Sequence, residues 1–427
     1  MKSRKRITFA LLAAVVVGVA ALAGTVSAAT KTSATLVIWT DSYRVAAFQQ
    51  IGAQYAAKHP GVTIVVKQKD FGVSDPGSIG GDLKTTTAAN APDIISATSD
   101  WIGALSADGL IVPLHLSTAQ KAHFPKYTLD GCSYAAGKVK NLYCVPTQVE
   151  NIGLVVNTKL AKVPTTWAGL EKAALAFKKA HHTAVGIAVP DGQPDGDPYH
   201  MYPFFSGLGG YIFGKTASGN LNKCAIGVAN PTFLSHASTI DKWNKEGLVS
   251  STVGYDNAKN LFLTGKLPYW ITGPWESSNL TDPKINAAAG HFKIVRVPMI
   301  YKSAVPFLGI QGASITKYAG THGVSAIAAD FVGNYLTSTN AQLKLANAEG
   351  RAPASTAAAK LVHDPVLAMF AKASKGGVPL PNIPEMGSVW KSLGDAWVNS
   401  TKGSGATKAR AAFSTAAQQI KTAIGCK

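Results

Sequence analysis

The segment from Thr35 to Val66 constrains the fold most, because it predicts a β-α-β unit. Residues 35–39 (TLVIW) and 62–66 (VTIVV) are apolar runs with the length of buried strands. Between them, apolar residues recur at helical spacing from Phe48 to Tyr55, and His59-Pro60-Gly61 ends that pattern. Strands joined through one helix pair in parallel, so the chain belongs to the α/β class. The connection has no Gly-x-Gly-x-x-Gly turn, which argues against a dinucleotide site.

The same alternation continues along the chain. Pro92 to Ile95 begins another strand, and Gln148 to Val156 is an apolar, β-rich run that suits a crossing between two lobes. Residues 352–360 and 401–409 are rich in Ala, Ser and Lys, and we expect them to be exposed. Helical patterns occupy Thr166 to Ala180, Pro231 to Glu246, His322 to Leu336, and Pro365 to Ala373 with Asp364 as its N-cap.

The N-terminus has the pattern of an export signal. Basic residues within 2–6 precede an apolar run from Ile7 to Gly24, and Val26-Ser27-Ala28 is a small-x-small cleavage site. An uncleaved anchor is the alternative, since the run is near membrane-spanning length. There is no Leu-x-Gly-Cys lipobox, and no later segment has the length and apolarity of a span. We therefore expect a soluble, exported protein.

Length and charge bound the organisation further. Of the 427 residues, 399 would remain after cleavage, which is more than one ordinary core holds and suits two lobes. The formal charge of +18 falls to +14 without the basic head of the signal. Because Lys and Arg are scattered and charged residues make up only 15% of the chain, nucleic acid is not the expected partner. Anionic cell wall, lipid headgroups or an acidic habitat are the alternatives.

The four cysteines of an exported chain are expected to form disulfides. Cys132 and Cys144 flank a predicted hairpin with its turn near Gly137, and could face each other across it. That pairing leaves Cys224 with Cys426. Four cysteines allow three pairings, so this one is a preference. Metal binding is the weaker alternative, because the sequence has no CxxC motif and no clustered His.

Residues 261–277, LFLTGKLPYWITGPWES, predict a ligand-binding loop. Gly265 suits the end of a helix, Leu267 to Ile271 reads as a buried strand, and Thr272-Gly273-Pro274 turns the chain. Trp275 then projects from a loop at a strand end, where open α/β folds bind ligands. A flat aromatic suits the apolar face of a pyranose ring. The alternative is that Trp275 fills a core.

From Leu36 to about Ile420 the order of landmarks resembles that of the extracellular solute-binding proteins of sugar ABC transporters, in particular the maltose- and maltodextrin-binding members. The landmarks include YAAKHPGVTIVV, PDIISATSDWIGALSADGLIVPL, VPTQVENIGLVVNTKL, PYHMYPFFSGLGGYIF, the Gly-Pro-Trp segment, PFLGIQGASI and PNIPEMGSVW. The resemblance implies a two-lobe periplasmic-binding-protein-like fold of type II, with a ligand cleft between lobes joined by a hinge. After a signal at 1–28, one lobe would comprise 29–147 and 314–350, and the other 148–313 and 351–427. Both preferred disulfides then lie within a lobe.

The resemblance also implies a sugar site in which aromatic rings stack on the apolar faces of the sugar and acids accept bonds from its hydroxyls. The residues matched in this way are Trp275, Trp390, Tyr199, Tyr255, Asp100, Glu150 and Asp197. Glu150 is the hardest to explain otherwise, because it interrupts an apolar run where an unpaired charge is costly. Trp390 could instead be core, Tyr199 and Tyr255 surface residues, and Asp100 a helix cap.

Several positions depart from the maltose pattern. Tyr43 and Arg44, with Asp41 nearby, occupy the places of an acid and a lysine. Trp101 stands, with Ala97, where the maltose binder has a tryptophan and an arginine, although it too could be core. Gly394 replaces a cleft arginine. We include Asp41, Tyr43, Arg44 and Trp101 in the predicted site, and the departures leave the identity of the sugar open.

The expected function is a non-enzymatic oligosaccharide receptor that closes on its ligand and delivers it to the membrane permease of an ABC importer. We expect a monomer without cofactor, metal or nucleic acid, in the periplasm or at the outer face of the membrane. It would contact the membrane only through the permease or an uncleaved signal. The alternatives are a secreted glycoside hydrolase that uses Asp100 and Glu150, and a binder of polyamine or ferric ion with the same fold.

Overall fold

The structure is a computed structural model that describes residues 33–136, 139–192 and 196–426. The predicted export signal at 1–28 lies outside these ranges. Within them, no helix combines the length and the apolarity that crossing a bilayer would need.

The predicted β-α-β unit is confirmed. Strand β1 (Ala34–Thr40), helix α1 (Val45–Lys58) and strand β2 (Val62–Gln68) follow one another, and β1 pairs in parallel with β2. Helix α1 buries its predicted apolar face, and strand β3 (Ile94–Thr98) pairs in parallel with the other edge of β1. These strands begin a mixed α/β fold.

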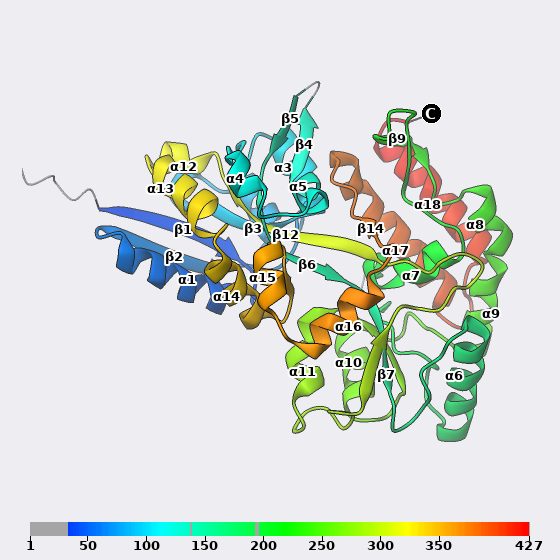
Figure 1. Cartoon of the computed structure of the whole chain (residues 1–427). Coiled ribbons are helices and arrows are strands. Elements are labelled where there is room, and N and C mark those ends of the chain that lie inside the picture. Colours follow the sequence, from blue (N-terminus) through cyan, green and yellow to red (C-terminus); the bar gives the residue numbers. More distant parts are fainter. Residues whose placement is uncertain (1–32, 137–138, 193–195, 427) are drawn as a thin grey trace, which may run out of the picture. The chain divides into compact units, whose positions relative to one another are not determined.

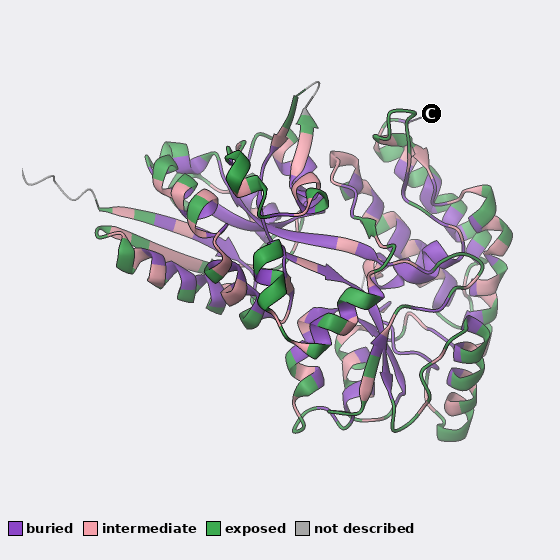
Figure 2. Ribbon diagram, in the orientation of Figure 1, coloured by how far each residue is buried: buried purple, intermediate pink, exposed green. Residues whose placement is uncertain are grey.

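The largest sheet has the strand order β13-β6-β12-β3-β1-β2, and β14 pairs with β12 (Figure 1). Its long central strand, β12 (Phe307–Ile315), is antiparallel to both β3 and β6. Strand β6 spans Val145–Asn151, and the short strands β13 and β14 span Ala352–Pro353 and Val378–Pro379. Figure 2 shows that β12 and β3 are buried along most of their length.

The segment predicted to cross between lobes joins two sheets. Strand β6 ends at Asn151, and β7 (Gly153–Asn157) begins after the single residue Ile152. Strand β7 is the centre of a second, antiparallel sheet with the order β10-β7-β11. Its neighbours are β10 (Tyr269–Thr272), which begins two residues later than predicted, and β11 (Phe292–Val295).

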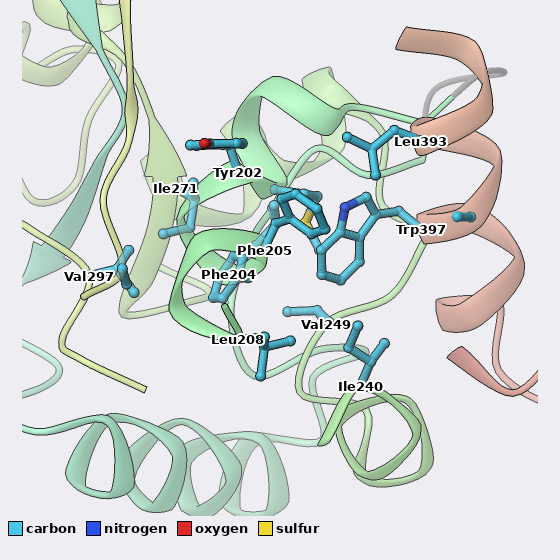
Figure 3. Packing of buried hydrophobic residues seen from close by; sticks show 14 of the residues in the cluster. Tyr202, Phe204, Phe205, Leu208, Ile240, Val249, Ile271, Val297, Leu393 and Trp397 are labelled. Carbon is cyan, nitrogen blue, oxygen red and sulfur yellow. The ribbon is translucent and has the colours of Figure 1, made fainter. Parts of the chain in front are cut away.

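Buried apolar side chains form separate cores on the two sides of this crossing. One core draws on residues between Leu36 and Val145 and between Ile310 and Ala354. The others draw on residues between Ile152 and Phe307 and between Val366 and Ile420. Figure 3 shows part of the second group, in which aromatic side chains of α7 (Pro198–Gly207) and Trp397 of α17 (Gly387–Thr401) point into one cluster.

Some helical predictions need correction. The pattern from 231 to 246 forms two helices, α8 (Pro231–His236) and α9 (Ser238–Glu246), which meet at Ala237. The pattern from 322 to 336 forms α13 (Ser325–Asp330) and a π-helical turn (Phe331–Tyr335). The pattern at 365–373 is confirmed as α16 (Pro365–Ala373), with Asp364 accepting bonds from the first-turn backbone.

The prediction that residues 352–360 are exposed is wrong for their first part. Pro353, Ala354 and Ser355 are buried, because β13 pairs with β6. In 401–409, Thr401 and Ala409 are buried while most of the residues between them are exposed.

Both preferred disulfides are present. Cys132–Cys144 closes the hairpin of β4 (Ser133–Ala136) and β5 (Val139–Leu142), and Cys224–Cys426 ties the end of the chain to β9 (Leu221–Ile226), which pairs with β8 (Phe213–Lys215). The described cysteines are all paired.

The remaining α-helices of the described ranges cover the sheets or follow their strands (Figure 1). They are α2 (Ile79–Thr85), α3 (Ser99–Ala107), α4 (Thr118–Lys121), α5 (Lys126–Gly131), α6 (Trp167–His181), α10 (Tyr255–Leu263), α11 (Ser277–Thr281), α12 (Tyr318–Thr321), α14 (Thr339–Glu349), α15 (Thr356–Leu361) and α18 (Ala409–Ala423).

Candidate functional site

All eleven residues of the predicted site line one cavity of about 780 Å³. Side chains associated with both groups of cores contribute to its walls. By element, the eleven are Asp41, Tyr43 and Arg44 after β1, Asp100 and Trp101 in the first turn of α3, Glu150 in β6, Asp197 and Tyr199 at the start of α7, Tyr255 at the start of α10, Trp275 after β10, and Trp390 in α17.

Trp275 is held by a chain of hydrogen bonds. It follows β10 in a 3-10 turn (Pro274–Glu276) and is half-buried, as expected for a side chain at a strand end. Its Nε1 donates to the Tyr255 hydroxyl over 2.5 Å, and that hydroxyl donates to Glu276 Oε1 over 2.6 Å. Burial, together with Glu276, raises the pKa of Tyr255, so the hydroxyl keeps its proton. Tyr255 therefore fixes the orientation of the Trp275 ring.

Asp197 organises the start of α7. Its Oδ1 accepts from the backbone N–H of His200 at 3.0 Å, and its Oδ2 lies 2.7 Å from His200 Nδ1. This N-cap aims Tyr199 and His200 into the cavity, where their ring centres lie 6.2 and 5.6 Å from that of Trp275. Burial raises the pKa of Tyr199, so its hydroxyl stays neutral.

Asp100 lies opposite Trp390. It is the second residue of α3, and Thr98 occupies the N-cap, so the alternative that Asp100 caps this helix is wrong. Its Oδ2 accepts from Trp390 Nε1 over 3.1 Å. Burial raises the pKa of Asp100 to about 6. Trp101 beside it is 3% exposed and belongs to the first core, although it also lines the cavity.

Glu150 is paired with a cation from a distant part of the chain. Its Oε2 accepts from Arg351 Nε over 2.5 Å and its Oε1 from Gln311 Nε2 over 2.8 Å. Burial opposes ionisation, but the guanidiniums of Arg351 and Arg44 outweigh it and hold the pKa of Glu150 below its usual value. The cation over the Trp275 ring is also Arg351, at 5.5 Å from the ring centre.

A second ion pair adjoins the first. Arg44 contacts Asp41, and its Nε donates to Glu349 Oε2 over 3.1 Å. Burial raises the pKa of Glu349 to about 7 despite the nearby guanidiniums. Across the described residues, buried acids outnumber buried arginines by seven to two. The acids are Asp41, Asp93, Asp100, Glu150, Asp191, Glu276 and Glu349.

Gly309 in β12 allows two cavity side chains to lie against the backbone. A Cβ at this position would come within 2.9 Å of Glu150 Cγ and 3.1 Å of the Tyr199 hydroxyl. A larger residue would displace these groups from the floor of the cavity.

Five residues that line the cavity each have a buried polar atom without a hydrogen-bond partner within the described part of the chain. The atoms are Asp100 Oδ1, Tyr199 OH, His200 Nε2, Gln311 Oε1 and Arg351 Nη1. A buried polar atom that makes no hydrogen bond costs free energy. The presence of five such atoms in residues that line one cavity is typical of a site that hydrogen-bonds a polar ligand.

Gln311, His200 and Arg351 also line the cavity, but they are not among the eleven predicted residues. Gln311 interrupts the apolar strand PFLGIQGASI, which is the same signal that singled out Glu150. His200 follows a matched tyrosine. Arg351 carried no sequence signal beyond its place directly after a helix-ending glycine, since the segment that follows it reads as exposed.

Two other features bear on the alternatives of a metal ligand and of a second binding site. Within 33–136, 139–192 and 196–426, no group of three or more His, Cys, Asp and Glu side chains is placed to hold a metal ion. A smaller hollow of about 550 Å³ beside α6 is mostly aliphatic, and its described lining includes no Asp, Glu or Trp.

The sequence of the chain is similar to those of several known proteins. The family model for bacterial extracellular solute-binding proteins matches residues 50–373. A galactooligosaccharide-binding protein of Bacillus subtilis is 26% identical over 100% of this chain and 99% of its own length. A maltodextrin-binding protein of the same organism is 28% identical over 71% of each chain. A maltooligosaccharide ABC transporter solute-binding lipoprotein of Streptococcus pneumoniae is 27% identical over 83% of this chain and 81% of its own.

Proposed function

The chain belongs to the bacterial extracellular solute-binding proteins, and we propose that it is an exported carbohydrate receptor of an ABC importer. Its ligand is a maltodextrin-like oligosaccharide, and its partner is the membrane permease of the importer. The names of the relatives support this class of ligand. It acts as a monomer and needs no cofactor.

One observation carries the proposal. The cavity combines ring faces, at Trp275, Trp390 and Tyr199, with buried carboxylates and unpartnered polar atoms. A pyranose ring presents apolar C–H faces to aromatic rings and a rim of hydroxyls to acceptors and donors. The eleven predicted residues are the binding set, to which we add Gln311, His200 and Arg351.

The mechanism is closure of two lobes on the ligand. We propose the division at 29–147 with 314–350, and 148–313 with 351–427. Separate cores on the two sides of the β6–β7 crossing support two lobes, and Ile310, Ala313 and Ala354 of the first core lie beyond these bounds. A ligand that contacts both walls of the cavity binds the closed arrangement better and so shifts the population toward it. The permease then recognises that arrangement.

A thermal-shift screen followed by calorimetry tests the function. Maltooligosaccharides, galactooligosaccharides, spermidine and ferric citrate are compared, and an oligosaccharide should raise the unfolding midpoint. At a ligand concentration of 100 Kd the stabilisation is about 2.7 kcal/mol. A rise with spermidine or ferric citrate and none with any sugar overturns the proposal.

Trp275→Ala tests the site itself. The half-buried Trp275 ring packs against a core from the cavity side. Its removal should weaken sugar binding by about tenfold or more. Circular dichroism should show that the variant remains folded. Tyr211→Ala removes a 41% exposed aromatic outside the cavity and serves as the control. Undiminished binding by the Trp275 variant contradicts the site assignment.

Glycoside hydrolysis is a second candidate, favoured by one observation. Asp100 and Glu150 line the same cavity with pKa values shifted in opposite directions, as a general acid and a nucleophile require. The ion pair of Glu150 with Arg351 instead suits a binding role. Release of glucose or galactose from the oligosaccharides by wild-type protein, and its loss in Asp100→Asn, would decide for the hydrolase.

A further inference from the structure

Phe71 is an exposed aromatic residue inside the cavity. Its side chain follows β2, is 54% exposed, and lies on the cavity wall formed by residues 71–75. A large apolar ring left open to water in a concave site loses the stabilisation that burial would give it, and this favours a ligand that covers it.

The back of the Phe71 ring is already supported. Its centre lies 4.8 Å from the ring of Trp101, and the guanidinium of Arg44 lies 5.8 Å from it. Both neighbours are almost fully buried. The ring is therefore fixed from behind, while its exposed part is available for a ligand.

The loop that carries Phe71 is held by its own backbone. Ile79 N–H donates to Asp70 O over 3.0 Å, and Gly80 N–H donates to Gly72 O over 2.9 Å. A Cβ at Gly80 would lie 2.6 Å from Val73 Cα, so only glycine allows helix α2 to approach the loop this closely. These contacts present Phe71 in a defined position before any ligand binds.

Phe71 belongs to an aromatic group distinct from that of Trp275. The described ring contacts of Trp275 are with Tyr199 and His200, whereas the described ring contact of Phe71 is with Trp101. Both groups line the same cavity. A ligand that contacts both groups therefore stacks on two separate sets of rings.

We propose that Phe71 forms an additional sugar-stacking subsite that selects linear oligosaccharides longer than a disaccharide. The inference rests on the proposed carbohydrate function. Ser74 and Asp75 line the cavity beside Phe71 and supply a hydroxyl and a carboxylate for the hydroxyls of the outer sugar unit. The main site around Trp275 holds the inner units, and Phe71 stacks on the outer one.

Calorimetry with two series of sugars tests this subsite. Glucose through maltopentaose, and galactose through galactotetraose, are titrated into wild-type protein, Phe71→Ala and Phe71→Trp. For wild type, affinity should rise between the disaccharide and longer members. Phe71→Ala should lose roughly tenfold for the longer sugars and stay within about twofold for the disaccharide, whereas Phe71→Trp keeps the gain with length.

The calorimetry results distinguish a failure of the proposed subsite from a failure of the proposed carbohydrate function. If Phe71→Ala weakens all lengths equally, or weakens none, the subsite is overturned while the carbohydrate function stands. If wild-type protein binds no sugar of either series, the proposed function fails and the subsite fails with it. Tyr211→Ala, which removes an exposed aromatic outside the cavity, should match wild type at every length. Equal thermal midpoints of the variants show that the comparison concerns binding and not folding.

Discussion

The indole Nε1 of Trp390 donates a hydrogen bond to Asp100 Oδ2 over 3.1 Å, which joins α17 to the first turn of α3. The two residues are associated with different walls of the cavity, because Trp390 packs against one core and Asp100 adjoins Trp101 of the other. Asp100 keeps its second oxygen without a partner among the described residues. A sugar hydroxyl could donate to that oxygen.

Ligand affinity should fall in acid because of Asp100. Burial raises its pKa to about 6, so this carboxyl stabilises the fold below its usual pKa of 3.8 and that contribution is lost as the pH rises through 6. The pH dependence of sugar binding has the opposite sign, because a sugar hydroxyl donates to the ionised carboxylate of Asp100. Affinity measured by calorimetry at pH 7.5, 6 and 5 should fall by up to tenfold per unit below pH 6, as an order of magnitude.

Two variants show which carboxyl group causes the pH dependence of sugar affinity. Asp100→Asn should bind more weakly at pH 7.5 and lose most of the dependence. Glu349 titrates in a similar pH range, because burial raises its pKa to about 7. The Glu349→Gln variant separates its contribution to the pH dependence from that of Asp100. An unchanged pH profile in Asp100→Asn would exclude Asp100 as the responsible group.

Tyr255→Phe should weaken binding without removing a ring. It deletes the hydroxyl that accepts from Trp275 and donates to Glu276. Leaving those groups unpaired should cost about 1–3 kcal/mol of unfolding free energy, and the freed indole should change the tryptophan emission. We expect a loss of roughly tenfold in sugar affinity, if the orientation of Trp275 contributes about 1.4 kcal/mol. Tyr211→Phe is the matched control, and identical affinities of the two variants would contradict this role.

Arg351→Met should destabilise the fold strongly. The change leaves Glu150 buried without its ion-pair partner, whereas Glu349 loses a contact with Arg351 but keeps its ion pair with Arg44. Breaking a buried pair in this way costs about 3–5 kcal/mol, measurable by urea unfolding. Combining Arg351→Met with Glu150→Gln removes the uncompensated charge of Glu150 and should recover part of the loss. A double variant no more stable than the single one would show that the pairing with Glu150 contributes little.

The two disulfides should be reduced in a fixed order. Cys224 is exposed at the surface, whereas Cys132 and Cys144 are fully buried. Mild reductant followed by alkylation and mass spectrometry should label Cys224 and Cys426 first. On the chain-entropy estimate, loss of the long-range bridge costs about 5 kcal/mol and loss of the hairpin bridge about 3 kcal/mol. Labelling of Cys132 before Cys224 would contradict the order.

Local patterns in the sequence predicted the elements that local chemistry decides. The β-α-β start, the Asp364 cap of α16 and the hairpin cysteines all depend on residues close together in the chain. The resemblance supplied what local patterns do not, namely that residues from distant segments of the chain line one cavity.

The incorrect predictions have two physical causes. Arg351 and the residues after it are buried because β13 pairs with β6, some 200 residues earlier in the chain. Asp100 reads as a cap because Asp favours that position, but α3 begins one residue before it. Tertiary pairing decided the first case, and a boundary shift of one or two residues decided the second.

The unequal burial of acids and bases has an electrical consequence. With seven acids and only two arginines buried among the described residues, most lysines remain at the surface while many of the carboxylates lie inside. Solvent and macromolecules therefore meet a polycation whose surface excess is larger than the charge of +14 expected without the signal suggests. An approaching anionic polymer is attracted over about 8 Å at physiological ionic strength, whereas a neutral sugar is guided by no such field and meets a carboxylate-rich interior only after it enters.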